Sequence, residues 1–207
     1  MSSKFLAMGV FLLGLLCFSG GLGAMDIRND NPLIMRMDSK KIITLAEAGD
    51  PQAQFDLAIM YGRGVGVQIN HNLAWDWIEK AANNAHAEAQ YWLAYGYFYG
   101  NNTALDRAKA FSWYKKSAES GYANAQFMVA YLLDTGKFTE IPREPVEAVK
   151  WYSTAGNSGH AEAAFRLGCK SYFGVDVAKN EAIAQRWFEI AEKNGLKGIS
   201  RLPFSMK

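Results

Sequence analysis

Few side chains in this 207-residue sequence have the types and spacing that metal binding or catalysis requires. Histidines can act as metal ligands and general bases, but the three present, His71, His86 and His160, are far apart in the sequence. His86 and His160 hold the same place in a repeated pattern, two copies apart, so helix spacings of about 8–10 Å would separate them by about 20 Å. No Ser/His/Asp, Cys/His or paired-carboxylate set is brought together by that pattern. The sequence therefore predicts no metal site, no cofactor and no catalytic residues.

A glycine-rich segment, residues 62–67 (Gly-Arg-Gly-Val-Gly-Val), invites comparison with phosphate-binding loops. It lacks the Lys-Ser/Thr pair of such loops, and it follows a predicted helix rather than a strand. We interpret it as a turn between two helices.

The densest run of aromatic residues, residues 91–99, holds six aromatics in nine positions. Trp92, Tyr95 and Tyr99 share one helix stripe at i, i+3 and i+7, and the equivalent positions of other copies hold different residue types. Binding interfaces are enriched in Trp, Tyr, Met and Arg. The alternative is that these side chains only pack between adjacent helices. We predict the following partner-binding residues: Trp92, Tyr95, Tyr99, Met128, Tyr131, Arg166 and Phe173.

The helices that would position this stripe follow from a repeat. Four tryptophans recur at intervals of 36, 38 and 36 residues, each with an alanine three residues earlier. A fixed period of this length indicates stacked copies of one small unit. In each copy an apolar i, i+4, i+8 pattern predicts a first helix, and a glycine then separates it from a second. We expect the repeat core to contain Trp77, Trp113, Trp151, Trp187, Ala53, Leu57, Ala89, Leu93, Ala125, Val129, Ala163 and Leu167.

The residues that recur at equivalent positions of the four copies resemble those of the Sel-one-like repeat (SLR) family, a relative of the tetratricopeptide repeats. The second copy carries the family pattern at Ala87, Ala89, Leu93, Tyr97, Gly100, Asp106, Ala110, Trp113 and Tyr114. The third copy departs from it, with Leu133 in place of a tyrosine and two extra residues in residues 139–145. The resemblance implies an all-α fold, a right-handed α-solenoid of about four and a half helix–turn–helix repeats. It also implies a non-catalytic scaffold with the first helices on its concave side.

The first 24 residues have the pattern of a secretory signal peptide, with Lys4, an apolar stretch over residues 5–18 and small residues up to Ala24. The alternative is an uncleaved membrane anchor, since no charge stands between Lys4 and Asp26. Cleavage would leave Cys169 as a lone cysteine that cannot form an internal disulfide, and we expect it to be partly buried.

The remaining chain divides by the same pattern. After residues 25–37, an N-terminal extension, we expect a solenoid over residues 38–202. It comprises a cap helix at 38–49, repeats at 50–85, 86–121, 122–159 and 160–195, and a C-terminal cap at 196–202; residues 203–207 form a tail. We expect the insertion that contains Pro142 and Pro145 to project from the third hairpin.

Charge narrows the class of partner. A net charge of +2 with interspersed signs does not favour nucleic acid, which would require a basic stripe. We expect an exported, periplasmic or secreted protein that binds a protein partner on its concave face, and that meets the membrane only if the N-terminal segment is retained. Alternatives within this class are an immunity protein against an envelope-directed toxin and an accessory subunit in envelope or motor assembly. A hydrolase is the alternative that the sequence supports least.

Overall fold

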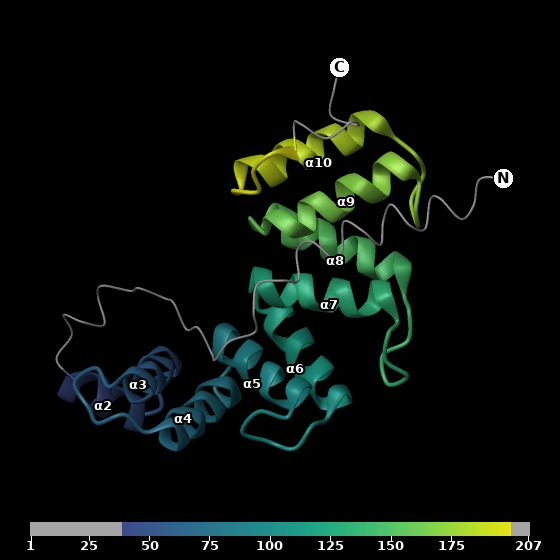
Figure 1. Ribbon diagram of the computed structural model, residues 1–207. Coiled ribbons are helices and arrows are strands. Elements are labelled where there is room, and N and C mark those ends of the chain that lie inside the picture. The colour runs from purple at the N-terminus through teal and green to yellow at the C-terminus, as the bar shows by residue number, and fades with distance from the viewer. Residues whose placement is uncertain (1–38, 200–207) are drawn as a thin grey trace. The chain divides into compact units, whose positions relative to one another are not determined.

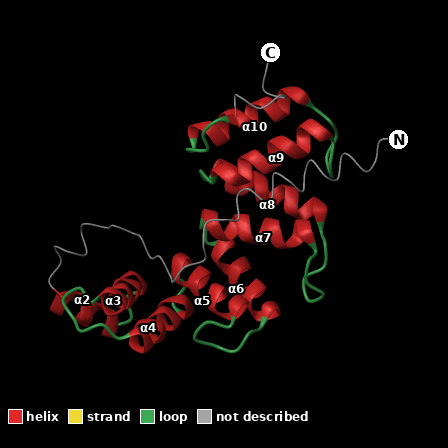
Figure 2. Cartoon of the chain, viewed as in Figure 1, coloured by secondary structure: helices red, strands yellow, loops and turns green. Residues whose placement is uncertain are grey.

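The computed structural model describes residues 39–199, and the statements below concern that part of the chain. The regular secondary structure of this range is helical apart from one isolated β-bridge, and no strand occurs in it (Figures 1 and 2). The predicted signal peptide or anchor, the N-terminal extension and the tail lie outside the described residues. The helices are α2 (Ser39–Glu47), α3 (Pro51–Arg63), α4 (His71–Asn83), α5 (Ala87–Tyr99), α6 (Arg107–Glu119), α7 (Ala123–Thr135), α8 (Pro145–Asn157), α9 (Ala161–Phe173) and α10 (Glu181–Lys193).

The helices pack in the order in which they occur in the sequence. Four hairpins, α3–α4, α5–α6, α7–α8 and α9–α10, contain the closest helix pairs, and α4–α5, α6–α7 and α8–α9 join one hairpin to the next (Figure 1). The shorter α2 packs against α3 at the N-terminal end. The predicted all-α helical repeat fold is confirmed. None of the helices in residues 39–199 is both long and apolar enough to cross a membrane.

Local sequence signals set the helix ends. Each first helix ends at a glycine with φ between 52° and 73°, a left-handed conformation that side chains disfavour: Gly64, Gly100, Gly136 and Gly174. Most second helices begin with a side-chain cap, in which Asn70, Asp106 or Asn180 accepts a backbone N–H of the first turn. Glu144 makes no such bond, and Pro145 starts that helix instead.

The core of each repeat is centred one residue away from the recurring tryptophans. Ile78, Tyr114, Tyr152 and Phe188 each directly follow one of those tryptophans and are at most 2% exposed. The tryptophans themselves are half-buried, and Trp113, Trp151 and Trp187 pack against the edges of the buried clusters. The predicted alanine, leucine and valine positions of the core are all buried.

A column of buried glutamines ties each of the first three hairpins to the helix before it, and the fourth has Ala164 at this position. The Nε2 atoms of Gln54, Gln90 and Gln126 donate to backbone carbonyls eight residues earlier, at distances between 3.1 and 3.3 Å. These carbonyls lie in the last turn of a helix, where the N–H four residues on is not available, and each also accepts an N–H from the turn that follows. The Ala-Gln pairs of the repeat therefore have a structural role.

The insertion after α7 does not stand free, contrary to the expectation from its sequence. Ile141 is 0% exposed, and the ring of Phe138 lies 5.3 Å from that of Phe98 at the end of α5. The guanidinium of Arg107 lies 4.6 Å from the Phe138 ring centroid. Burying these apolar groups stabilises the folded-back loop, so the insertion covers the end of the second hairpin.

Candidate functional site

Three of the predicted binding residues form a continuous row of rings along α5. The ring centroids of Trp92 and Tyr95 are 5.8 Å apart, and those of Tyr95 and Tyr99 are 4.5 Å apart. Tyr99 is 38% exposed, and Trp92 and Tyr95 are half-buried. These rings pack on one another while still presenting surface to solvent, which suits a binding surface.

Two further predicted binding residues lie on the first helices of the next two repeats. Tyr131 lies on α7 and Arg166 on α9. Burial raises the pKa of the Tyr99 hydroxyl, and the phenols of Tyr95 and Tyr131 raise it further. The Arg166 guanidinium of α9 lies 5.4 Å from the Tyr131 ring centroid, within cation–π range. We call this surface, formed by Trp92, Tyr95, Tyr99, Tyr131 and Arg166, the aromatic stripe.

Two other predicted binding residues have different surroundings. Met128 is half-buried and packs against the core cluster between the second and third hairpins. Phe173 is 40% exposed, and its ring lies 5.1 Å from that of Tyr172. Cys169 is a partly buried free thiol, as its sequence context predicts, and burial raises its pKa to about 12.

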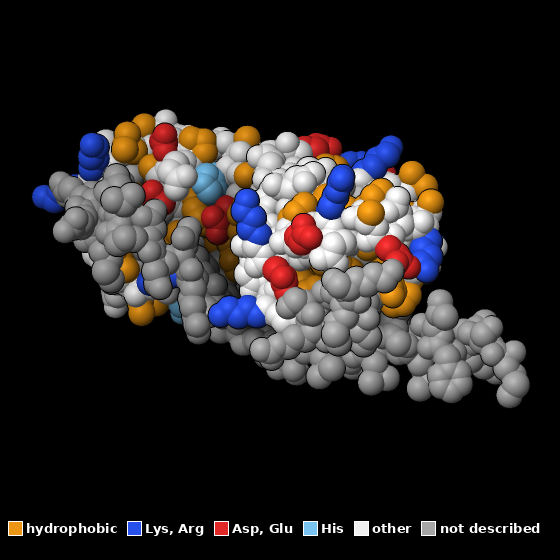
Figure 3. Space-filling view, turned by 90° about the horizontal axis from the view of Figure 1, so that it is seen from above, with side chains coloured by type: hydrophobic (Ala, Val, Ile, Leu, Met, Phe, Trp, Pro, Cys, Tyr) orange, Lys and Arg blue, Asp and Glu red, His pale blue; other side chains and the backbone are white. Residues whose placement is uncertain are grey.

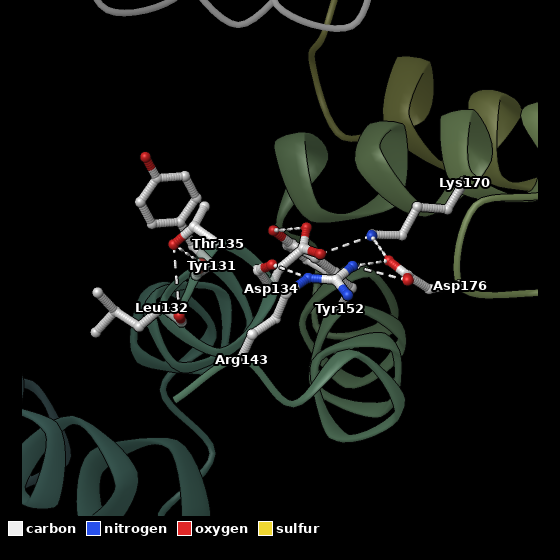
Figure 4. Close-up of polar contacts among 8 residues, drawn as sticks. All are labelled: Tyr131, Leu132, Asp134, Thr135, Arg143, Tyr152, Lys170 and Asp176. Atoms are coloured by element: carbon white, nitrogen blue, oxygen red, sulfur yellow. Dashed lines mark hydrogen bonds and ion pairs between the residues drawn. The ribbon is translucent and has the colours of Figure 1, made fainter. Parts of the chain in front are cut away.

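Sequence reasoning missed a network of charges between the third and fourth repeats (Figure 4). The ammonium of Lys170, a residue that is 9% exposed, lies 2.7 Å from Asp134 Oδ1 and 2.8 Å from Asp176 Oδ2. Arg143 Nη2 donates to both carboxylate oxygens of Asp176 at 2.7 Å, and Arg143 Nε donates to the backbone carbonyl of Asp134. The hydroxyl of Tyr152 donates to Asp134 Oδ2 at 3.3 Å.

The network joins two loops to two helices. Arg143 comes from the α7–α8 loop and Asp176 from the α9–α10 loop, whereas Asp134 and Lys170 lie on α7 and α9. Burial opposes ionisation of Asp176, but the hydrogen bonds from Lys170 and Arg143 outweigh burial and lower its pKa. Two cations and two carboxylates balance one another, so the network has a structural role.

The tyrosine of the second repeat that corresponds to Tyr152 lacks this partner. Tyr114 is 0% exposed, and its hydroxyl has no hydrogen-bond partner in the described part of the chain. Phe98 occupies the place in α5 that Asp134 occupies in α7, so no carboxylate is available there. The equivalent place in the second repeat is therefore apolar.

Two of the histidines cap helices. The Nδ1 atoms of His86 and His160 accept the backbone N–H of Ala89 and Ala163, at 3.1 and 3.2 Å. The His160 ring also stacks on Phe127 of the preceding repeat at 4.3 Å between centroids. Burial lowers the pKa of His160 to about 4, because the charged imidazolium would lose hydration, and the positive charge of Arg166 lowers it further.

This burial predicts a stability that falls in mild acid. Because the folded pKa of His160 lies below its usual value, the stabilising contribution is complete above about pH 6.5 and is lost as pH falls towards about 4. We expect a loss on the order of 2–3 kcal/mol over this window, measured by urea unfolding at a series of pH values. His160→Asn retains a capping oxygen and should flatten the dependence, whereas substituting the exposed His71 should leave it unchanged. An unaltered slope in His160→Asn would contradict this assignment.

Within residues 39–199, no group of three or more His, Cys, Asp or Glu residues could hold a metal ion. Figure 3 shows Lys/Arg and Asp/Glu side chains interspersed over the face that it presents, as the sequence composition indicates. The aromatic stripe, with its half-buried and exposed rings, is the candidate site for a macromolecular partner.

The chain is similar to known repeat proteins. The family model of the Sel1 repeat matches residues 51–86, 87–122, 123–160 and 161–196. A Sel1 repeat protein from Oxalobacter formigenes is 30% identical, with a TM-score of 0.71 over 80% of this chain and 48% of its own. A protective antigen present in uropathogenic Escherichia coli strains, which displays an SLR fold, is 27% identical, with a TM-score of 0.68 over 77% of this chain and 34% of its own. No curated protein matches the sequence at a significant level.

The chain spans about half the length of the first of these proteins and about a third of the second. The four matched segments correspond to the hairpins α3–α4, α5–α6, α7–α8 and α9–α10. The resemblance inferred from the sequence is confirmed. The chain belongs to the Sel1 repeat family, whose members mediate protein–protein interaction and generally act as non-catalytic scaffolds.

Proposed function

We propose that this protein is an exported, non-catalytic binding module, and that it holds a protein partner against the aromatic stripe on the concave side of its repeat array. The observation that carries the proposal is the row of ring contacts from Trp92 through Tyr95 to the exposed Tyr99 on α5, beside the contact between Arg166 of α9 and the Tyr131 ring of α7. Trp, Tyr and Arg are the residue types that most often dominate binding energy at interfaces.

The stripe borders the packing that builds the fold, since the ring of Tyr99 lies 4.9 Å from that of the buried Phe98 and Tyr131 packs against the same core cluster. Tyr91, which belongs to the repeated columns, packs its ring 5.4 Å from that of the buried Tyr114. Trp92, next to it, is half-buried and contacts both Tyr91 and Tyr95, at 5.6 and 5.8 Å between ring centroids. A rigid array that presents rings with few rotatable bonds loses little conformational entropy on binding, which favours affinity.

The proposed export rests on the N-terminal sequence alone, which has the pattern of a signal peptide ending at Ala24. Mass spectrometry of the protein recovered from the periplasm should find a chain that begins at Met25. A chain that keeps residues 1–24 in the membrane fraction would contradict cleavage and support the anchor. The immunity and envelope-assembly roles are narrower forms of the proposal, and the identity of the partner separates them.

Affinity capture from envelope extract tests the binding function. Trp92→Ala should reduce recovery of the partner at least tenfold, because truncating a central aromatic anchor typically costs about 2 kcal/mol or more. Val146→Ala is the matched control, since Val146 is an exposed apolar residue on α8 outside the stripe, and its recovery should equal that of the wild type. Equal recovery by Trp92→Ala and Val146→Ala would show that the stripe is structural.

A further inference from the structure

The loop between α7 and α8 is two residues longer than the equivalent loops of the other three hairpins. Its base is closed, because the Glu144 N–H donates to the Leu133 carbonyl at 2.8 Å. Within it the Ile141 N–H donates to the Phe138 carbonyl at 3.0 Å. A loop whose ends are close and whose own side chains pack is a compact element. We call residues 137–143 the strap.

One part of the strap is anchored on the second repeat. Ile141 is 0% exposed and belongs to the core cluster that includes Phe98 of α5 and Tyr114 of α6. The Phe138 ring lies 5.3 Å from the Phe98 ring and 4.6 Å from the guanidinium of Arg107, at the start of α6. In Figure 1 the α7–α8 loop reaches towards α6. Removal of these apolar groups from water holds the strap against the second repeat.

The other part of the strap is anchored on the fourth repeat. Arg143 Nη2 donates to both carboxylate oxygens of Asp176, in the α9–α10 loop, at 2.7 Å (Figure 4). The ammonium of Lys170 on α9 lies 2.8 Å from the same carboxylate. The Asp176 side chain is only 14% exposed, so solvent screens these interactions less than it screens a surface pair. The strap therefore contacts the repeats on both sides of its own.

Such a connection is not part of the usual packing of a repeat array. All the extensively packed pairs among helices α3 to α10 lie within one hairpin or join neighbouring hairpins. The stability of such an array is approximately a sum of repeat terms and nearest-neighbour terms. The strap adds a contact of a different kind, because one short, closed segment is held by the second repeat and by the fourth.

We propose that the strap is a conformational device that couples the second repeat to the fourth across the third. Release of either anchor loosens the other, so the three repeats open together rather than one at a time. The strap thereby fixes the spacing of α5, α7 and α9, the first helices that carry Tyr99, Tyr131 and Arg166. The coupling does not depend on the proposed binding function.

Hydrogen exchange of the full chain, followed by NMR, tests the coupling. The readouts are three equivalent amides at the start of second helices. The N–H groups of Asn70, Asp106 and Asn180 donate across their hairpin loops to backbone carbonyls, at distances between 2.8 and 2.9 Å. Their exchange rates report the opening of the first, second and fourth hairpin loops.

Phe138→Ala removes the ring that anchors the strap on the second repeat. Exchange at Asn180, in the fourth repeat, should accelerate at least about fivefold. Asp176→Asn removes the charge that anchors the strap on the fourth repeat and should accelerate exchange at Asp106, because coupling between two sites is reciprocal. Exchange at Asn70 should be unchanged in both variants, since the strap has no anchor on the first repeat.

Two further variants separate the strap from the core beneath it. Phe111 is a half-buried phenylalanine of α6 that packs against the same core cluster but lies outside the strap. Phe111→Ala should therefore accelerate exchange at Asp106 and leave Asn180 unchanged. Arg143→Gln cuts the connection between the two anchors. In that background Phe138→Ala should have no further effect at Asn180, so the two changes should not be additive.

Unchanged exchange at Asn180 in Phe138→Ala would overturn the proposal. Equal acceleration by Phe111→Ala would overturn it as well, because the core and not the strap would then transmit the effect. Acceleration at Asn70 would show a general loss of stability instead of coupling. Circular dichroism establishes that each variant is folded. If Phe138→Ala is not, Phe138→Leu replaces it, since it keeps an apolar side chain and loses only the ring contacts with Phe98 and Arg107.

Discussion

Replacing Lys170 with alanine should lower the free energy of unfolding by about 3 kcal/mol, because two largely buried carboxylates would lose their shared cation. The Lys170 ammonium lies within 2.8 Å of both Asp134 and Asp176, and its side chain is only 10% exposed. Arg143 would still compensate Asp176 but would leave Asp134 without a charged partner. Urea unfolding followed by circular dichroism measures the change.

The matched control is Lys179→Ala. Lys179 lies 3.2 Å from Glu181, but both side chains are more than half exposed, so its removal should change stability by less than about 0.5 kcal/mol. Equal effects of Lys170→Ala and Lys179→Ala would show that the buried network contributes no more than a surface pair.

Which helices of the repeat array are destabilised by Lys170→Ala provides a second test. In a repeat array each unit contacts mainly its neighbours, so damage between α7 and α9 should remain local. Hydrogen exchange in Lys170→Ala should accelerate in α7 to α10 and stay unchanged in α3 and α4. Uniform acceleration along the chain would indicate that the array unfolds as one unit instead.

Asp176→Asn removes the charge without straining the loop. Asp176 has a φ of 59°, and the equivalent position of the second repeat is Asn102 with a φ of 60°. Because the pKa of Asp176 is lowered in the folded chain, its contribution is present above the usual aspartate pKa and is lost as pH falls through the lowered value. The variant should therefore be less stable than the wild type at neutral pH and nearly equal to it in strong acid.

The sequence was sufficient to predict the helices and their ends, because these depend on local signals that recur. A left-handed glycine such as Gly100 and a cap such as Asp106 act within one turn of the chain, and four copies reinforce each signal. The stripe on α5 could be predicted for the same reason, since Trp92, Tyr95 and Tyr99 lie on one helix face by spacing alone.

The charge network could not be predicted because its members do not recur. Asp134 has Phe98 at the equivalent position of the second repeat, and Asp176 has Gly66 and Asn102 at equivalent positions. Two of its members lie in loops whose paths are set by tertiary contacts. The insertion shows the same limit, because the burial of Ile141 depends on the second hairpin rather than on neighbours in the sequence.

In each repeat a deeply buried large side chain directly follows the recurring tryptophan. This offset leads to the second prediction with a large effect on stability. Tyr152→Ala should cost about 3–5 kcal/mol of unfolding free energy, because its ring is 0% exposed and is enclosed by the core cluster that joins α7, α8 and α9. Trp151→Ala should cost less, about 1–3 kcal/mol, because the indole is half-buried at the edge of two clusters. Chemical unfolding of both variants decides the order.

The tyrosine ring and its hydroxyl can be separated by a third variant. Tyr152→Phe keeps the packing and removes only the bond to Asp134, so it should cost about 1 kcal/mol. Tyr114→Phe is the matched control, since the Tyr114 hydroxyl has no partner among the described residues, and it should be neutral or slightly stabilising. A larger loss in Trp151→Ala than in Tyr152→Ala would mean that the repeat core is centred on the tryptophan column, as the spacing alone suggests. The expected order instead places the centre on the following residue, because transfer of a side chain from water scales with the area it buries and not with how regularly it recurs.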